Sequence, residues 1–335
     1  MSGRALVTLL VLLLPASLLL AIMLGAVSLP ASGMLGALVG AGPGDDRLTL
    51  IVQYIRLPRA ILTALVGALL AICGAAMQGL FRNPLADPSL IGVTAGASAG
   101  ASLVIVFAGA VSGFAGLSLV SMGAFAGGTV AVVMVYRLAT GPAGTSVATM
   151  LLAGIAITAL AGSLSSLLEF YASNEMLRRI SLWRMGGLDG ANWARVAIVA
   201  FVSLLIFVIL PLQARALNAL LLGESEARHL GVPVDRVKRR LVLLAAAGVG
   251  VSVAVAGAIA FVGLVVPHIV RMLIGPDHRW LLPASALSGA VLLLWADTLA
   301  RIVVAPTELP VGLLTALLGA PFFISLLRQR REYGM

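Results

Sequence analysis

The sequence predicts an all-α polytopic membrane protein with about ten transmembrane helices. Hydrophobic residues make up 61% of the 335 residues and charged residues only 10%, which lies far outside the usual composition of a soluble domain. Apolar stretches of roughly 20 residues, the length that crosses the hydrocarbon core, recur from one end of the chain to the other. These stretches are apolar on every face, whereas the strands of a membrane barrel alternate apolar and polar residues. Helices are therefore the predicted spanning element.

The whole chain, residues 1–335, is predicted to form a single transmembrane domain. The first apolar run could also be a signal peptide, but it is long for such a segment and no cleavage pattern follows it. The eighth span is too short to cross a bilayer upright unless protein flanks it. In chain order the expected spans are Ala5–Val27, Arg59–Leu80, Ser89–Ala108, Phe114–Tyr136, Val147–Glu169, Ala194–Leu212, Leu241–Phe261, Val265–Ile274, Leu281–Val304 and Val311–Leu327.

The basic residues predict the orientation of the chain. An even number of spans places both termini on one side, and most arginines and lysines fall in segments on that same side. The positive-inside rule assigns that side to the cytoplasm, so both termini are predicted to be cytoplasmic. The net charge of +9 could suggest nucleic acid, but the basic residues stand at span ends and form no single stripe. The expected surroundings are membrane lipid, with no nucleic-acid partner.

Cys73, the single cysteine, lies within an apolar span. We interpret it as a buried structural thiol, because one cysteine can form neither a disulfide framework nor a thiol-rich metal site. No metal site is predicted. The 37 glycines include many inside spans, where small residues let helix backbones approach closely.

The longest polar break between spans, Gln213–Arg240, has the pattern of two short helices on the cytoplasmic face. These are Gly223–Leu230 and Val234–Arg240, joined through Gly231. Acidic residues near the start of the first helix and basic residues near the end of the second suit the helix dipole. The alternative is a solvated loop.

Five short strings follow one another along the chain: Ile55–Arg59 (IRLPR), Gly74–Ala86 (GAAMQGLFRNPLA), Leu220–Leu230 (LLLGESEARHL), Ala256–Pro267 (AGAIAFVGLVVP) and Glu308–Pro321 (ELPVGLLTALLGAP). Together, in this order, they resemble the iron-complex and vitamin B12 permeases of bacterial type II ABC importers. The resemblance runs from about Arg56 to the C-terminus.

The resemblance implies a homodimer of ten-helix subunits in the bacterial inner membrane, with the translocation pathway along the twofold axis. It also implies two cytoplasmic ATPase subunits and a periplasmic substrate-binding protein as partners. The chain lacks a GxxxxGK[ST] phosphate-binding loop, so we expect a transport subunit and not an enzyme. ATP and Mg²⁺ would be used by the partner ATPase, and no cofactor is expected on this chain.

The resemblance also assigns roles to two sets of residues. The coupling segment, which would insert into a cleft on the ATPase, matches at Gly223, Glu224, Ala227, Arg228, Leu230 and Gly231. Docking of the binding protein would use Arg56, Arg59 and Arg301, since arginine suits bidentate contacts with carboxylates. Any one of these arginines could instead be an interfacial anchor. Asp297 is expected to be structural and to pair with Arg301 at i+4.

The predicted substrate pathway has an outer and an inner part. At the outer mouth stand Arg178, Arg179, Trp183 and Arg184, which suit a flat apolar cargo with carboxylates. We therefore rank haem first, an anionic ferric siderophore second and the nearly neutral cobalamin last. At the inner end, Thr145, Ser146 and Thr149 are candidates for a hydroxyl gate, by similarity to the cobalamin permeases. The equal alternative is that Thr145 or Ser146 simply caps the fifth span.

Two other classes of membrane protein compete with this interpretation. An ion-coupled secondary transporter would need intramembrane ionisable residues or broken helices at matched positions of inverted repeats, and beyond Asp297 the sequence shows no such matched pair. An intramembrane enzyme would need a constellation such as HExxH or a pair of carboxylates, and the predicted spans contain neither.

Overall fold

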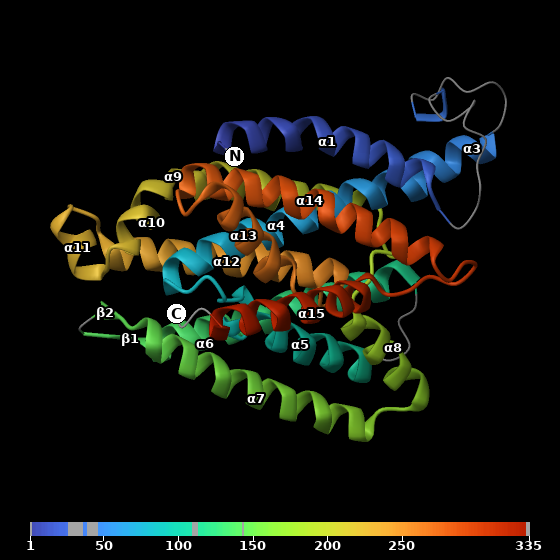
Figure 1. Cartoon of the computed structure of the whole chain (residues 1–335). Helices are drawn as coiled ribbons and strands as arrows, with labels where there is room; N and C mark the ends of the chain where they lie inside the picture. Colours follow the sequence, from blue (N-terminus) through green and yellow to red (C-terminus); the bar gives the residue numbers. More distant parts are fainter. Residues whose placement is uncertain (1, 26–35, 39–45, 109–112, 143, 333–335) are drawn as a thin grey trace.

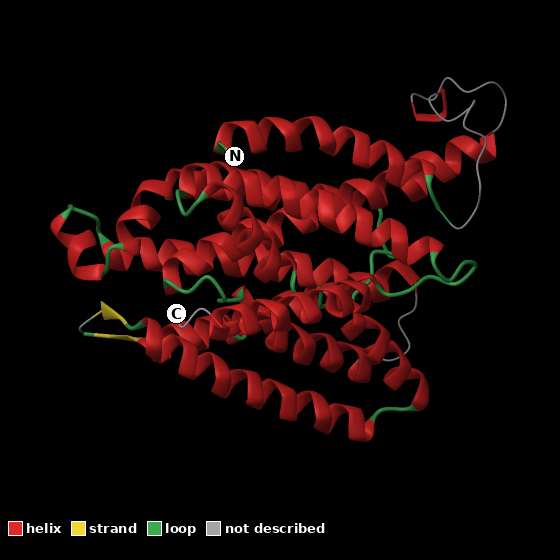
Figure 2. Ribbon diagram, in the orientation of Figure 1, coloured by secondary structure: helices red, strands yellow, loops and turns green. Residues whose placement is uncertain are grey.

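The computed structural model describes residues 2–25, 36–38, 46–108, 113–142 and 144–332 and shows a bundle of nearly parallel and antiparallel helices (Figures 1 and 2). A short antiparallel hairpin of β1 (Thr140–Gly141) and β2 (Gly144–Thr145) is the sheet found in that part of the chain. The helical elements are α1 (Gly3–Met23), α3 (Asp46–Leu50), the π-helical η1 (Ile51–Arg56), α4 (Leu57–Phe81), the 3-10 helix η2 (Pro88–Ile91), α5 (Val93–Phe107), α6 (Gly113–Ala139), α7 (Val147–Tyr171), α8 (Asn174–Met185), α9 (Trp193–Leu212), α10 (Ala214–Leu221), α11 (Glu224–His229), α12 (Val234–Ala256), α13 (Val262–Ile274), α14 (His278–Ile302) and α15 (Val311–Glu332).

The ten expected spans correspond to ten helices of the structure. Seven helices in the described part are long and apolar enough to cross a membrane, and three shorter apolar helices, α5, α13 and the first part of α15, complete the set. The short eighth span is confirmed as α13, which packs against α4 and α14. The first span is described up to Gly25, so the end expected at Val27 lies outside the described residues.

Helix α4 forms the centre of the bundle. Every residue from Val66 to Phe81 is buried, because α14, α12, α13 and α9 all pack against it. Cys73 lies in this stretch and is a free, buried thiol, as predicted. Because this stretch is enclosed by four helices, it fixes the positions of its neighbours.

Glycines are the packing devices that the sequence predicted. A Cβ atom on Gly67 of α4 would collide with the carbonyl oxygen of Gly289 in α14, and one on Gly100 of α5 would collide with that of Gly123 in α6. Helix backbones can come this close only where side chains are missing.

The predicted second cytoplasmic helix, Val234–Arg240, was wrong as a separate element. These residues are the first turns of α12, which continues without a break to Ala256, so the span predicted as Leu241–Phe261 starts and ends earlier. The apolar residues Val234, Val237 and Leu241 share one buried face and join the charged and apolar parts into one helix. Helices α8 and α10 and the hairpin were not predicted as elements.

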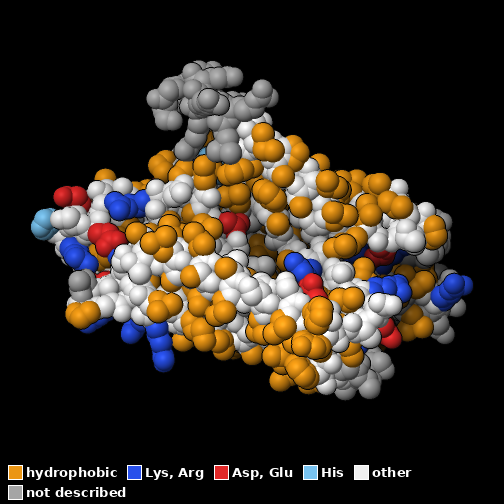
Figure 3. Space-filling view, turned by 90° about the horizontal axis from the view of Figure 1, so that it is seen from below, with side chains coloured by type: hydrophobic (Ala, Val, Ile, Leu, Met, Phe, Trp, Pro, Cys, Tyr) orange, Lys and Arg blue, Asp and Glu red, His pale blue; other side chains and the backbone are white. Residues whose placement is uncertain are grey.

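The bundle has two distinct ends. The hairpin and α11 project at one end, which also holds the start of α1, and the end of α15 turns toward it (Figure 1). We call it the hairpin end. The opposite end carries α3 and α8 and is called the α8 end. On the face formed by α7, α5 and α15, charged side chains lie mainly toward these two ends and hydrophobic ones between them (Figure 3).

Candidate functional site

The residues singled out by the sequence lie in three regions: an ion cluster at the α8 end, a pocket beneath α8, and α11 with the hairpin. In the ion cluster, Asp297 of α14 pairs with Arg59 of α4 at 2.9 Å and with Arg301 one turn along its own helix at 3.1 Å. Glu308 pairs with Arg59 from the exposed side at 2.7 Å. The predicted i+4 pair is therefore confirmed, and Asp297 is held by two guanidinium groups.

All three arginines predicted to dock a binding protein form hydrogen bonds or ion pairs with other residues of the bundle. Arg56 is 6% exposed and donates to the carbonyl oxygens of Ile22 and Met23, at 2.7 and 2.9 Å, at the end of α1. Arg301 is 5% exposed and donates to the carbonyls of residues 21 and 24 of the same helix end. These bonds close the C-terminal end of α1, whose last carbonyls have no helical partner. The docking role stays a prediction.

A pocket of about 210 Å³ lies beneath α8 at the same end of the bundle. Arg179 and Trp183 of α8 line it, together with Arg195 and Asp189. The Arg195 guanidinium donates to the hydroxyl of Ser121 and to a carbonyl at the end of α12, each at 3.2 Å. Two guanidinium groups and an indole ring thus surround one concave site that is open at the surface.

The other two predicted arginines of this region lie outside that pocket. Arg178 is exposed on α8, and Arg184 pairs with Glu169 of α7 at 2.8 Å. Arg195 is the residue that sequence reasoning missed as a member of the site. Hydropathy and spacing give no reason to place it there, because nothing in the sequence brings α9 beneath α8.

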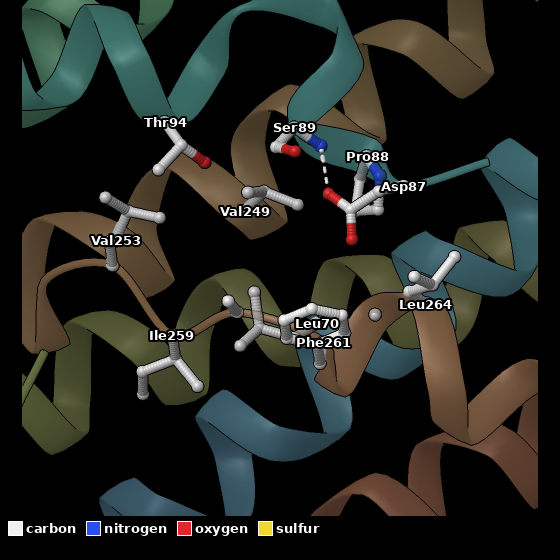
Figure 4. Close-up of a pocket in the computed structure, with 13 residues that line it drawn as sticks. Leu70, Asp87, Pro88, Ser89, Thr94, Val249, Val253, Ile259, Phe261 and Leu264 are labelled. Atoms are coloured by element: carbon white, nitrogen blue, oxygen red, sulfur yellow. Dashed lines mark hydrogen bonds between the residues drawn. The ribbon is translucent and has the colours of Figure 1, made fainter. Parts of the chain in front are cut away.

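A second cavity, of about 290 Å³, lies between α4, α12 and the segment that joins α4 to α5. Its walls are mostly apolar, and Asp87 is the acidic side chain that reaches it (Figure 4). One carboxylate oxygen accepts the N–H of Ser89 at 2.7 Å, and the other points into the cavity. Burial raises the pKa of the Asp87 carboxyl, and the hydrogen bonds from Ser89 offset only part of that rise. This carboxylate was also missed.

The opposite wall of this cavity is the break between α12 and α13. Residues 257–261 are not helical, and Phe261 has a positive φ of 68°. Ile259 and Phe261 face Asp87 across the space (Figure 4). An interrupted helix at membrane depth is tolerated where protein or a cavity surrounds it.

At the hairpin end, α11 confirms the first predicted short helix, Gly223–Leu230, and we call this helix with its flanking residues 223, 230 and 231 the knob. Its start, Gly223, has a φ of 119°, and the turn after it, Gly231, has a φ of 79° with open space around it. Both positions lie in the left-handed region that favours glycine. Ala227 is the fully buried residue of α11, whereas Leu230 is 65% exposed and Arg228 is exposed as well.

The predicted hydroxyl gate divides into two different local roles. Ser146 caps α7 by accepting the N–H of Thr149 at 3.2 Å, so the capping interpretation is confirmed for Ser146. Thr145 is buried in strand β2, and its hydroxyl lies 3.0 Å from that of Thr140 across the hairpin. A gate function for these side chains stays a prediction.

Comparison with known proteins places the whole chain in one family. The sequence profile of the FecCD transport family matches residues 11–329. The hemin transport system permease HmuU of Yersinia pestis is 48% identical over 288 residues, 86% of this chain and 86% of that protein. The cobalamin import system permease BtuC of Halobacterium salinarum is also 48% identical, over 84% of this chain and 74% of that protein.

A solved structure supports the same assignment. A metal-chelate type ABC transporter in an inward-facing conformation superposes with a TM-score of 0.86 and 32% identity over 97% of this chain and 99% of that one. The fold is thus that of a type II ABC importer permease, and its relatives are transport permeases, not enzymes. The chain belongs to the FecCD transport family.

Proposed function

We propose that this chain is the permease subunit of an ATP-driven inner-membrane importer and that its cargo is haem. The pocket beneath α8 is the observation that carries the choice of haem, because it combines Arg179, Arg195 and Trp183. Guanidinium groups suit carboxylates such as the two propionates, and an indole suits a flat apolar ring. The hemin permease of Yersinia pestis is among the most similar relatives.

Two alternative cargoes have support of their own. An anionic ferric siderophore would suit the same arginines, and the neighbouring solved structure is described as a metal-chelate transporter. Cobalamin has a permease of equal identity among the relatives, but a nearly neutral corrinoid gains little from two arginines. Haem therefore ranks first, siderophores second and cobalamin last.

The assembly that we propose follows the resemblance. Two copies would form the pathway, with both termini cytoplasmic, two ATPase subunits at the hairpin end and a periplasmic binding protein at the α8 end. The coupling contact would use Gly223 to Gly231, with Leu230 and Arg228 offered to the ATPase because both are exposed. The inner gate would lie at residues 145–149. No cofactor is proposed for this chain, since ATP and Mg²⁺ would be bound and used by the partner ATPase.

Uptake by the reconstituted complex tests the choice of cargo. Haem, a ferric hydroxamate, a ferric catecholate and cobalamin are offered in parallel to proteoliposomes that contain the ATPase, each with its matched binding protein. We expect ATP-dependent uptake of haem. Arg179→Ala and Arg195→Ala should each slow it from several-fold to about a hundred-fold, the effect of removing a charged hydrogen-bond partner worth about 1–3 kcal/mol.

Arg215→Ala is the matched control, because Arg215 is an exposed arginine between α9 and the knob at the other end of the bundle. It should transport haem at the wild-type rate. Uptake of a siderophore or of cobalamin in place of haem would overturn the choice of cargo. Uptake that continues without the ATPase would overturn the importer assignment itself.

A further inference from the structure

The two functional sets at the hairpin end, the coupling segment and the candidate gate, are joined by a lysine that belongs to neither. Lys238, in the second turn of α12, donates from its Nζ atom to the carbonyl oxygen of Thr145 at 2.6 Å. The same ammonium group pairs with the carboxylate of Glu224 in α11 at 2.5 Å. One side chain thus contacts the knob and the hairpin, which are about 80 positions apart in the sequence.

Because Lys238 is buried, its ammonium group depends on both of these partners. The Lys238 residue is 1% exposed, the largest side chain among the fully buried residues that the structure describes. A buried ammonium group that loses its partners is left without solvation, which is costly. The contacts to Glu224 and Thr145 are therefore kept together, unless the start of α12 rearranges. The neighbouring basic residues Arg236, Arg239 and Arg240 are all exposed and carry no such constraint.

A second link runs in parallel to the first. Asp235, one turn before Lys238, accepts the backbone N–H of Thr145 at 3.3 Å and pairs with Arg228 of α11 at 3.4 Å. Thr145 is therefore bound through both its N–H and its C=O by two charged residues of α12. Each of these residues also contacts α11. The second link is exposed at its ion pair and therefore weak, whereas the Lys238 link is buried.

The same helix carries this junction into the membrane. From Lys238, α12 runs without interruption to Ala256, where it borders the pocket beneath α8. The hairpin in turn leads directly into the first turn of α7 at Ser146. A displacement of α11 that preserves the buried contact must therefore move the entrance of α7 as well.

We propose that Lys238 is a positioning residue that makes residues 144–149 move together with α11 when the ATPase acts on the knob. This rests on the proposed importer function, in which α11 is the coupling contact and residues 145–149 are the inner gate. Lys238 itself would touch neither cargo nor ATPase. Its ammonium group converts a displacement of α11 into a displacement of the gate segment.

The first test measures coupling in proteoliposomes that contain the ATPase and the binding protein. Lys238→Met keeps the length and the apolar stem of the side chain but cannot pair. We expect its basal ATP hydrolysis to stay within about two-fold of wild type while cargo moved per ATP falls about ten-fold, the scale of a lost charge-assisted contact. Lys238→Arg keeps a charged donor and should recover most of the loss.

The second test measures the link directly. Spin labels are placed at Gly141 in the hairpin and Ser225 in α11, both exposed, in a Cys73→Ser background. In complexes with one labelled and one unlabelled copy, pulsed electron resonance should give one narrow distance that persists with and without ATP. Lys238→Met should broaden that distribution, and so should Glu224→Gln, which removes the same contact from the partly exposed side. Glu224→Gln therefore tests the same contact if the Lys238→Met protein fails to accumulate.

Arg240→Met and Glu226→Gln are the matched controls, because each removes an equal charge from the same helix ends at an exposed position. Both should keep the narrow distance. A Lys238→Met protein with the wild-type transport ratio and an unchanged distance would overturn the proposal. If the wild type shows no ATP-dependent uptake, the importer function fails, and the distance measurement still decides whether Lys238 ties the hairpin to α11.

Discussion

At the scale of single residues, Asp297 is the side chain on which the α8 end depends most. Its carboxylate, 2% exposed as a residue, pairs with both Arg59 and Arg301, which are themselves almost enclosed. Removing one member of a buried ion cluster leaves the others uncompensated in a medium that solvates them poorly. The same reasoning means that replacing these arginines by glutamate would disturb the bundle before it reports on docking.

We therefore expect Asp297→Asn to lower the free energy of unfolding by about 3–5 kcal/mol, since the buried Arg301 loses its carboxylate partner and Arg59 keeps only its pair with the exposed Glu308. Thermal unfolding of the purified protein in detergent measures the change. Glu308→Gln is the control: it removes the exposed partner of Arg59 and should cost no more than about 1 kcal/mol. Equal losses in the two variants would contradict the assignment of Asp297 as the central charge.

At the scale of elements, the contact between α4 and α14 depends on two facing glycines. A Cβ atom on Gly289 would collide with the carbonyl oxygen of Gly67 and lie 2.5 Å from the Cβ of Ala71. The obstacle is largely backbone, which cannot turn aside as a flexible side chain can. Because α14 also carries Asp297, a shift of this helix would open the ion cluster too.

Gly289→Ala should consequently lower the free energy of unfolding by about 1–3 kcal/mol, the usual cost of overpacking a close contact. The midpoint of unfolding by a denaturing detergent gives the difference. Gly162→Ala on α7 is the matched variant, because a Cβ atom there meets nothing within 4 Å. It should stabilise the helix by up to about 1 kcal/mol. A Gly289→Ala protein as stable as the wild type would refute the close packing of α4 and α14.

At the scale of the whole molecule, the outward faces of α1 and α7 are both mainly apolar, and α7 differs in carrying hydroxyl groups near its middle. Exposed positions of α1 include Leu9, Leu12 and Leu19, which suit contact with lipid. The exposed face of α7 also carries hydroxyl groups, at Thr158 and Ser163. Small polar residues on a transmembrane face suit a neighbouring helix or a water-filled passage. In the two-copy assembly proposed above, we expect the α7 face to turn toward the second copy and the pathway.

Labelling with a membrane-impermeant maleimide tests this orientation. In a Cys73→Ser background, Thr158→Cys and Ser163→Cys should react in the assembled complex, at least in one stage of the transport cycle, because water reaches them along the pathway. Leu12→Cys and Leu19→Cys should stay unlabelled, since lipid covers them. Labelling of the α1 positions with protection of the α7 positions would reverse the assignment of the two faces.

The sequence by itself determined the class, the ten helices and the family. A span needs a fixed length of apolar residues, so the spans could be read from hydropathy alone, and even the short α13 was found. Local chemistry was also readable: Gly231 at a turn with positive φ and the i+4 pair of Asp297 and Arg301 depend on residues close in the chain. The helix that starts at Val234 was misjudged, because a charged first turn resembled a separate surface helix.

The tertiary structure alone decided which of many similar charges act together. Lys238 is one of four basic residues within positions 236–240. It alone of these four is buried, because α11 and the hairpin pack around it. Arg195 and Asp87 likewise gained their places from helices that are remote in the sequence. A side chain's partners depend on contacts between distant segments, which hydropathy and spacing do not encode. The physical reason is that burial belongs to the assembled bundle, whereas periodicity belongs to each helix.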